Sequence, residues 1–119
     1  MKLTEKIKKE ILEQAKEEAP NECCGLIALV KGDLEYFPCG NISAFPTESF
    51  ALDGYETVED NSDEIIGLVH SHPNHSVEFS EVDKSACEES ELIWFIIDPV
   101  SELWNSYDPC GISHKLGIT

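Results

Sequence analysis

Two histidines separated by one residue stand directly after an apolar run, and an aspartate follows some ten residues later. His70 and His72 end a predicted buried strand over 65–69, and side chains two apart on a strand point to the same face, so both imidazoles can bind one ion. Asp83 lies in the first turn of a predicted helix over 80–90, from which the loop can return a carboxylate as third ligand. Two His and one carboxylate leave a coordination position open for water, which is typical of catalytic zinc, and zinc lowers the pKa of that water. The pattern predicts a hydrolytic zinc site that needs a second carboxylate as base.

A structural explanation competes for part of this pattern. Ser80 and Asp83 have the spacing of a helix N-terminal capping pair, and a single histidine at a strand end is usually a surface or core residue. The joint pattern, however, fixes His70-x-His72-Pro73, six residues, Ser80, two residues and Asp83. In a chain of this length such a combination arises by chance on the order of one time in ten thousand or more rarely. The spacing therefore favours the metal site.

The complete pattern resembles the signature of the JAMM, or MPN+, metalloproteases, in which an upstream glutamate precedes HxHPx6SxxD. The segment 20–26, Pro-Asn-Glu-Cys-Cys-Gly-Leu, is similar to the family's glutamate segment, and the resemblance covers roughly 20–99. It implies a cytidine-deaminase-like α/β fold of the JAB/MPN type, with a mixed central sheet flanked by helices. The roles it implies are zinc ligation by His70, His72 and Asp83, general-base catalysis and proton transfer by Glu22, and oxyanion stabilisation by Ser80.

Within this family, the segments 50–52 and 80–95 are most similar to tail-tip assembly peptidases of tailed phages. The resemblance implies zinc-dependent hydrolysis of a peptide or isopeptide bond, in phage tail assembly or in host cell-wall penetration. Such proteins often carry an NlpC/P60-type cysteine-peptidase domain after the zinc domain, and this chain ends before one could begin. The expected partners are a peptide or protein substrate, phage tail proteins and an NlpC/P60-type protein on another chain.

Other functions remain open at this point. One alternative is deconjugation of ubiquitin-like or sulfur-carrier proteins, and another is a non-catalytic MPN-type scaffold. Iron oxygenases share the ligand types, but their carboxylate usually lies between the two histidines in sequence. A zinc nucleobase deaminase would need Cys-x-x-Cys and His-x-Glu, and the sequence has neither.

The length and charge of the chain limit the number of domains and the kinds of partner that it can bind. The chain has 119 residues, which predicts one domain over 1–119, and 24 acidic residues against 8 Lys and no Arg give a net charge of −16. Nucleic acid would be repelled, and cationic or neutral peptides are the expected partners, although an acidic surface can also serve solubility alone. No apolar run is long enough to span a bilayer, so the expected location is the cytoplasm, or the host cytoplasm or virion tail for a phage protein.

The cysteines lack the spacing of a zinc site or a disulfide framework, and Cys87, near Asp83, is expected to face the core. His75 is expected to be an exposed loop residue, and His114 has no partner near it in sequence.

Hydrophobic periodicity predicts the elements that must position the candidate site residues. In the first half of the chain they are an amphipathic helix over 3–19, strands over 25–30 and 34–39 joined by a tight turn, and irregular chain over 41–50 with a short strand near 49–52. In the second half they are a helix or loop over 55–63, the strand over 65–69, the helix over 80–90, a strand over 92–97 and an edge strand over 103–107.

Overall fold

The structure is a computed structural model, which describes residues 3–73 and 76–112. Among the described residues, no helix is long and apolar enough to cross a membrane. In chain order the elements are α1 (Glu5–Glu18), β1 (Cys24–Val30), β2 (Asp33–Asn41), β3 (Leu52–Asp53), α2 (Tyr55–Asp60), β4 (Glu64–Ser71), α3 (Glu81–Ser90), β5 (Ile93–Ile97) and β6 (Trp104–Tyr107).

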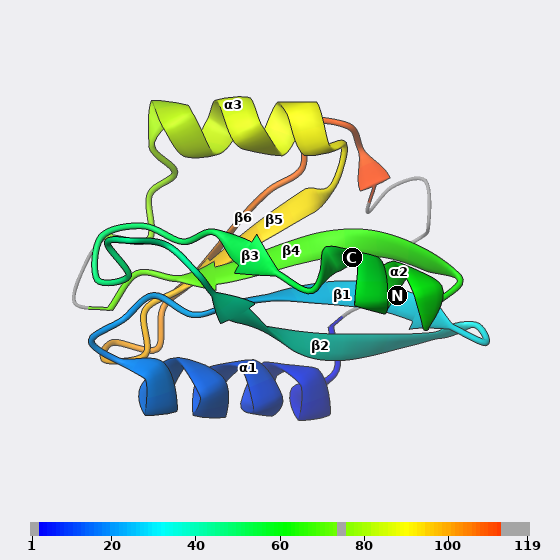
Figure 1. Ribbon diagram of the computed structural model, residues 1–119, viewed down its shortest axis with the longest axis horizontal. Helices are drawn as coiled ribbons and strands as arrows, with labels where there is room; N and C mark the ends of the chain where they lie inside the picture. The colour runs from blue at the N-terminus through cyan, green and yellow to red at the C-terminus, as the bar shows by residue number, and fades with distance from the viewer. Residues whose placement is uncertain (1–2, 74–75, 113–119) are drawn as a thin grey trace.

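The strands form one mixed sheet in the order β3-β2-β1-β4-β5-β6. Strands β4 and β5 run parallel and are connected through α3, whereas the other neighbouring pairs run antiparallel. Helix α1 covers one face of the sheet and α3 covers the other (Figure 1). This confirms the expected α/β fold with a mixed central sheet flanked by helices, and it gives the molecule three layers.

Helix α1 forms because its sequence supplies both a cap and an apolar stripe. The Thr4 hydroxyl accepts a hydrogen bond from the Ile7 backbone N–H at 3.1 Å, which satisfies one of the free donors of the first turn. Ile7, Ile11 and Ala15 recur at fourfold spacing and are buried against the sheet, while charged side chains face solvent. The helix contributes one wall of the core and no chemistry.

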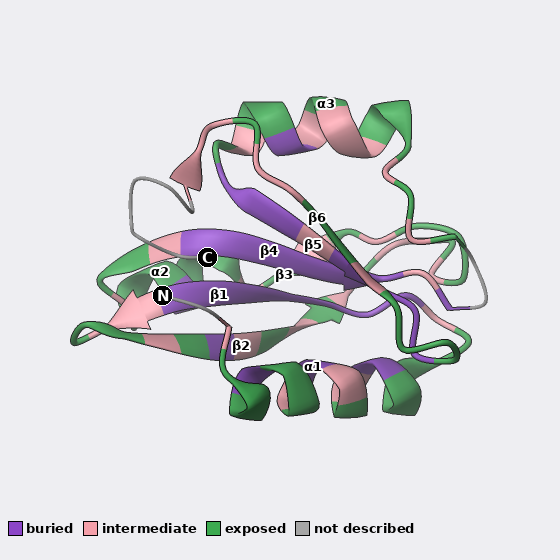
Figure 2. Cartoon of the chain, turned by 180° about the vertical axis from the view of Figure 1, so that it is seen from behind, coloured by how far each residue is buried: buried purple, intermediate pink, exposed green. Residues whose placement is uncertain are grey.

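The buried residues form two clusters, one on each face of the sheet. The first joins α1 to side chains such as Ile27 and Ile66, and the second joins α2 and α3 to side chains such as Leu26 and Trp94. Figure 2 shows that burial is concentrated in β1, β4 and β5, the central strands. A strand buried on both faces reads as a continuous apolar run, which is why these strands could be predicted from sequence.

A bulge in β4 determines which face receives the histidines. The register between β1 and β4 slips by one residue at Ile66, which becomes an extra residue in β4. Ile65 packs on the α3 side, and because of the slip Leu68, three residues later, packs on that side too. His70 lies two residues beyond Leu68 and shares its face. Without the bulge, His70 would point toward α1.

The predicted elements are present, with small differences in their bounds. The short strand expected near 49–52 is β3, which begins only at Leu52, because residues 43–51 form a loop held by its own hydrogen bonds. The segment 55–63 is helical only as far as Asp60. Strand β2 extends two residues past its predicted end at Cys39 and reaches Asn41, whose side chain is important at the site.

Candidate metal centre

Three potential ligand atoms converge where β4 ends and α3 begins. The Nε2 atoms of His70 and His72 are 3.1 Å apart. One carboxylate oxygen of Asp83 lies 3.8 Å from the His70 nitrogen, and the other lies 3.9 Å from the His72 nitrogen. Among the described residues these three form the group of His, Cys, Asp and Glu that could hold a metal ion, with ligand atoms within 4.8 Å of one another. The structure thus brings the three predicted ligands together.

The spacing of these atoms suits a small tetrahedral cation. Zinc–nitrogen bonds of about 2.0 to 2.1 Å place two tetrahedral ligands about 3.3 Å apart, so each donor would need to move by only about half an ångström. Two imidazoles and one carboxylate also match the donor types that zinc accepts. The residues therefore fit zinc, and three protein ligands would leave a fourth position for water if zinc were bound.

His72 is held in the tautomer that a metal ligand requires. Its Nδ1 lies 2.9 Å from the backbone carbonyl oxygen of Ser76. A carbonyl oxygen can only accept, so Nδ1 carries the proton and donates it, and Nε2 keeps a free lone pair in the neutral ring. The loop after β4 therefore orients His72 as well as delivering Asp83.

His70 is held by aromatic rings instead. It is fully buried, stacks on Phe50 at a centroid distance of 4.5 Å, and meets the edge of Trp94 at 5.5 Å. Its Nδ1 is buried and has no hydrogen-bond partner among the described residues. Burial and the neighbouring His72 ring lower the pKa of His70, outweighing the nearby carboxylate of Asp83, so the ring is neutral and able to donate a lone pair.

Asp83 and Ser80 also cap α3. The Ser80 hydroxyl accepts from the Asp83 N–H at 3.0 Å, and the Ser80 N–H donates to Asp83 Oδ2 at 3.2 Å, which completes a capping box. The helix-capping role expected for Ser80 and Asp83 is therefore confirmed. The same Asp83 carboxylate also lies close to both histidines, so capping does not prevent it from being a ligand. The cap fixes the Asp83 carboxylate at the helix N-terminus, facing both rings.

Glu22 reaches the same place through the sheet register. Cys24 pairs with His70, and the Cys23 N–H donates to the Ser71 hydroxyl at 2.7 Å. Continuing this antiparallel pairing by one residue places Glu22 beside His72, on the face that carries His70. The 47 residues between Glu22 and His70 are thus spanned by the pairing of β1 with β4.

The surroundings of Glu22 make its carboxyl group a proton acceptor near neutral pH. Its side chain is only 4% exposed. Burial, and then the negative charge of Asp83, raise its pKa to about 7. Among the described residues its carboxylate forms no hydrogen bond, so its proton affinity is set by these two effects.

Asn41 is a site residue that the sequence analysis missed. Its amide NH₂ donates to the backbone oxygens of Glu22 at 2.9 Å and Ser49 at 3.1 Å, and its amide oxygen accepts from the N–H groups of Ser43 and Ala51, each at 3.0 Å. It therefore ties Glu22 to the loop that carries Phe50. The signal available in the sequence was an Asn-x-Ser turn motif directly after a strand.

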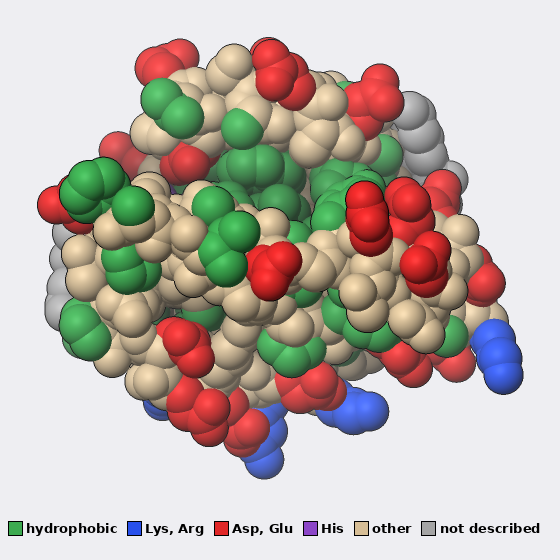
Figure 3. Space-filling view, viewed as in Figure 1, with side chains coloured by type: hydrophobic (Ala, Val, Ile, Leu, Met, Phe, Trp, Pro, Cys, Tyr) green, Lys and Arg blue, Asp and Glu red, His purple; other side chains and the backbone are tan. Residues whose placement is uncertain are grey.

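The site residues open into one cavity of about 520 Å³. Glu22, His72, Ser80 and Asp83 line it, together with apolar side chains that include Trp94. Figure 3 shows hydrophobic side chains gathered in a hollow below α3, on a face that otherwise carries many acidic side chains. Trp94 packs in the core and also borders the cavity.

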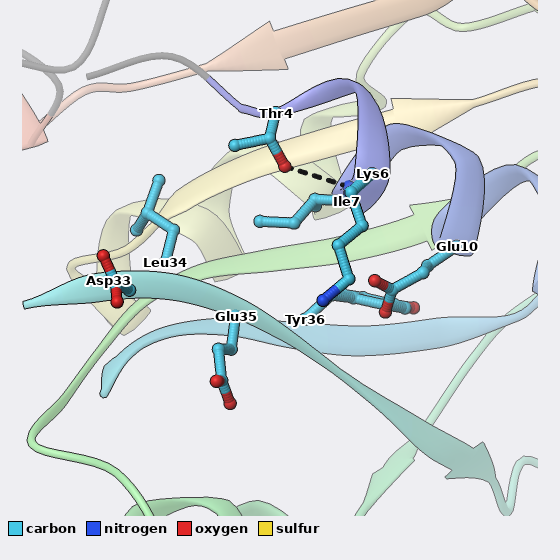
Figure 4. Close-up of a pocket in the computed structure, with 8 residues that line it drawn as sticks. All are labelled: Thr4, Lys6, Ile7, Glu10, Asp33, Leu34, Glu35 and Tyr36. Carbon is cyan, nitrogen blue, oxygen red and sulfur yellow. Dashed lines mark hydrogen bonds between the residues drawn. The ribbon is translucent and has the colours of Figure 1, made fainter. Parts of the chain in front are cut away.

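A second cavity of about 560 Å³ lies between α1 and β2 (Figure 4). Its lining includes Lys6, Glu10, Glu35 and Tyr36 but no histidine. In it the Thr4 hydroxyl is used by the α1 cap (Figure 4), and Tyr36 donates to Gln14. Size alone would not have identified the cavity that carries the candidate metal ligands.

Other residues singled out in the sequence have simpler places. Cys87 is fully buried in the α3-side core, and its Sγ contacts the Leu92 carbonyl at 3.4 Å, which confirms the expected core thiol. Burial raises its pKa to about 11, so the thiol stays protonated. His75 and His114 lie outside the described residues.

Comparison with known proteins defines the class to which this fold and site belong. The family of prokaryotic homologs of the JAB domain matches residues 4–109, so the chain belongs to this family. Tail tip assembly protein K of Escherichia phage N15 is 42% identical over 89 residues, which are 73% of this chain and 36% of that protein. The chain thus spans well under half the length of this relative. The resemblance to JAB/MPN domains and to the phage branch is confirmed.

Solved structures agree with this assignment. A solution structure of a protein from Desulfitobacterium hafniense matches with a TM-score of 0.68 and 28% identity, covering 88% of this chain and 81% of that one. A JAB1/MPN domain protein from Archaeoglobus fulgidus matches with a TM-score of 0.62 and 26% identity, covering 91% and 89%. These likenesses extend over nearly the whole described chain.

Proposed function

We propose that this chain is a zinc-dependent hydrolase of peptide or isopeptide bonds that acts in phage tail assembly or host cell-wall penetration. The observation that carries the proposal is the meeting of three ligand atoms beside a cavity that a further buried residue with a carboxylate, Glu22, also lines. A structural role alone needs no fourth ionisable group beside His70, His72 and Asp83. Burying Glu22 next to another carboxylate is unfavourable, and such arrangements are concentrated at functional sites.

In this proposal His70, His72 and Asp83 would hold zinc. When bound there, zinc would supply Lewis acidity toward a substrate carbonyl and toward water. Glu22 takes a proton from the attacking water and returns it to the leaving amine. Its pKa of about 7 suits both steps, since a general base and acid works best near the operating pH.

Ser80 has a free proton for the second role proposed for it. Its oxygen accepts the hydrogen bond from the Asp83 N–H, so the hydroxyl hydrogen remains available to donate into the cavity that Ser80 lines. A donor fixed at a helix N-terminus can stabilise the negative charge that develops on a carbonyl oxygen during hydrolysis. Capping and catalysis therefore use different parts of the same hydroxyl group.

A non-catalytic scaffold is the second candidate, because the capping box gives Ser80 and Asp83 a structural use without any metal. A scaffold, however, gives no reason for the buried carboxylate of Glu22. The phage setting is supported by the tail tip assembly relative, and the proposed partners are tail proteins and an NlpC/P60-type protein. The corresponding locations are the host cytoplasm and the virion tail.

The test is cleavage of a peptide library, read by mass spectrometry, with zinc content measured in the same samples. Wild-type protein loaded with zinc is expected to produce new termini, and a chelator should stop the cleavage until zinc is restored. Glu22→Gln should keep its zinc and lose cleavage by roughly 100-fold or more, the range for removal of a general base. Equal cleavage by wild type and Glu22→Gln contradicts the proposal.

A further inference from the structure

Exposed hydrophobic side chains gather at the end of the sheet that carries the site. We call this end, where β2, β4 and β5 finish, the site end (Figure 1). Of the six large hydrophobic side chains that are exposed among the described residues, five belong to segments at this end, and Tyr55 at the start of α2 is the sixth. The five are Ile42, Phe45, Val82, Val100 and Leu103.

The cavity has two different walls. Val82, in the first turn of α3, is 78% exposed and lines the cavity together with Ala86. The opposite wall comes from the loop after β2, which contributes Phe50 and the exposed carboxylate of Glu48. A chain crossing this cavity therefore meets apolar side chains from both segments and, on the loop after β2, the carboxylate of Glu48.

The charges at the site end are unbalanced. Its two described lysines already pair with glutamates, Lys16 with Glu102 at 3.4 Å and Lys84 with Glu81 at 3.9 Å. The Glu48 side chain forms no ion pair or hydrogen bond with another described residue, and it has no part in the proposed chemistry. With a net charge of −16, a second copy of this chain would be repelled, so charge complementarity favours a cationic occupant.

We propose that the cavity binds an extended polypeptide segment in which an apolar residue adjoins a lysine or arginine. The apolar side chain lies against Val82 and Phe50, and the cationic side chain lies against Glu48. The inference rests on the proposed function, because it takes this segment to be the substrate of the same site. It adds the class of sequence that the site selects.

The test uses zinc-loaded Glu22→Gln protein, so that bound peptide stays intact, and fluorescence anisotropy as the measure of binding. The probes are four labelled peptides in a common Gly-Ser frame that differ at two adjacent positions: Leu-Lys, Leu-Glu, Ser-Lys and Ser-Glu. The Leu-Lys peptide is expected to bind most tightly. Replacing Leu by Ser, or Lys by Glu, should weaken binding of the peptide by about tenfold in each case. The difference between the Lys and Glu peptides should become smaller as the salt concentration is raised.

Second substitutions in the Glu22→Gln background test which residue causes the preference for Leu and which causes the preference for Lys. Glu48→Lys should reverse the order of the Lys and Glu peptides, while Glu59→Lys, the same charge change on α2, should not. Val82→Ser should weaken the Leu peptides to the level of the Ser peptides, while Tyr55→Ser should leave them unchanged. Neither control residue lines the cavity.

The outcomes separate this inference from the proposed hydrolysis. Equal binding of the four peptides, no binding, a preference for Glu, or an equal effect of the control variants overturns the inference, whatever the wild type cleaves. If instead the predicted order appears but the zinc-loaded wild type cleaves none of the peptides, the hydrolase proposal fails and the peptide-binding surface stands.

Discussion

The two faces of the sheet are both covered by a helix, yet the candidate metal ligands lie on only one of them. On the α1 face the apolar stripe of the helix meets apolar strand residues, with Ile7 and Ile11 buried along it. On the α3 face the apolar core gives way, at the site end, to the buried ring of His70 among Phe50 and Trp94. Each face also has a cavity of similar volume beside it.

The difference follows from topology. The α1 face is crossed by one continuous helix, whereas α3 begins just beyond the carboxyl end of β4, so ligands from a strand end and a helix start can meet. In open α/β sheets, sites form outside the carboxyl ends of strands for this reason. We therefore expect changes on the α1 face to affect stability and changes at the site end to affect metal binding and catalysis.

The largest expected effect is on zinc affinity. His72→Ala removes one of three proposed ligands and should weaken zinc binding by about 1,000-fold, more than the loss of a residue that only supports a ligand. Competition with a chelator of known affinity measures the change. Because His72 is only partly buried, the thermal unfolding temperature of the metal-free variant should differ little from that of the metal-free wild type. A metal-binding constant equal to that of the wild type would contradict the assigned ligand set.

The matching change on the other face is Ile11→Ala. Ile11 is fully buried under α1, so its truncation should lower the free energy of unfolding by about 3 kcal/mol, measured in urea. The folded variant should bind zinc as tightly as the wild type. Ile42→Ala, at a 66% exposed position, is the control and should change the unfolding free energy by less than about 0.5 kcal/mol. A large loss of zinc affinity in Ile11→Ala would break the separation between the two faces.

The pH dependence of metal-free protein tests the burial of Glu22. Its pKa in the folded state, about 7, exceeds the ordinary glutamate value of 4.5, so the folded state binds more protons and stability falls as pH rises from about 4.5 to 7. The fall should be about 2 kcal/mol relative to Glu22→Gln, because solvent screening in the cavity that Glu22 lines reduces the roughly 3 kcal/mol that such a pKa difference implies. Neutral, buried His70 acts in the opposite direction, and the comparison with Glu22→Gln removes its contribution. Parallel pH curves for the two proteins would show that Glu22 is not buried as described.

The smallest effect concerns the position of Glu22. In Asn41→Asp one carboxylate oxygen can still accept hydrogen bonds from the backbone N–H groups of Ser43 and Ala51. The other oxygen replaces the NH₂ donor and is repelled by the backbone oxygens of Glu22 and Ser49. Stability should fall by about 1 kcal/mol, and kcat should fall about tenfold with zinc affinity nearly unchanged.

Asn61→Asp is the matched control for this change. Asn61 also donates its amide to a backbone carbonyl, that of Thr57 at 2.7 Å, but it lies at the end of α2. It should leave kcat unchanged. An equal loss of kcat in both variants would show that Asn41 has no special part in positioning Glu22.

Much of this site could be predicted from sequence because its parts are local. His70 and His72 lie two apart on a strand, and Ser80 and Asp83 lie three apart at a helix start, so short-range geometry fixes how each pair points. The elements themselves followed from apolar runs and from the alternation of charged and apolar residues. The family resemblance supplied Glu22.

What the sequence could not supply depends on long-range pairing. Glu22 lines the same cavity as His72 because Cys24 pairs with His70, and no local pattern encodes that register. The bulge at Ile66, which turns His70 toward α3, is likewise visible only in the paired strands. Asn41 acts through backbone groups of distant residues, which leave no mark in composition or periodicity.

The central claim is that Asp83 completes a zinc site as well as capping α3. Asp83→Asn is the most direct test, because the amide oxygen can still accept from the Ser80 N–H and preserve the cap, whereas the negative charge toward the histidines is lost. Metal analysis after zinc loading and dialysis should find about one zinc per wild-type chain and far less in Asp83→Asn, with unchanged thermal unfolding of the metal-free proteins. Wild-type protein without zinc, or the same zinc content in both proteins, would contradict the account.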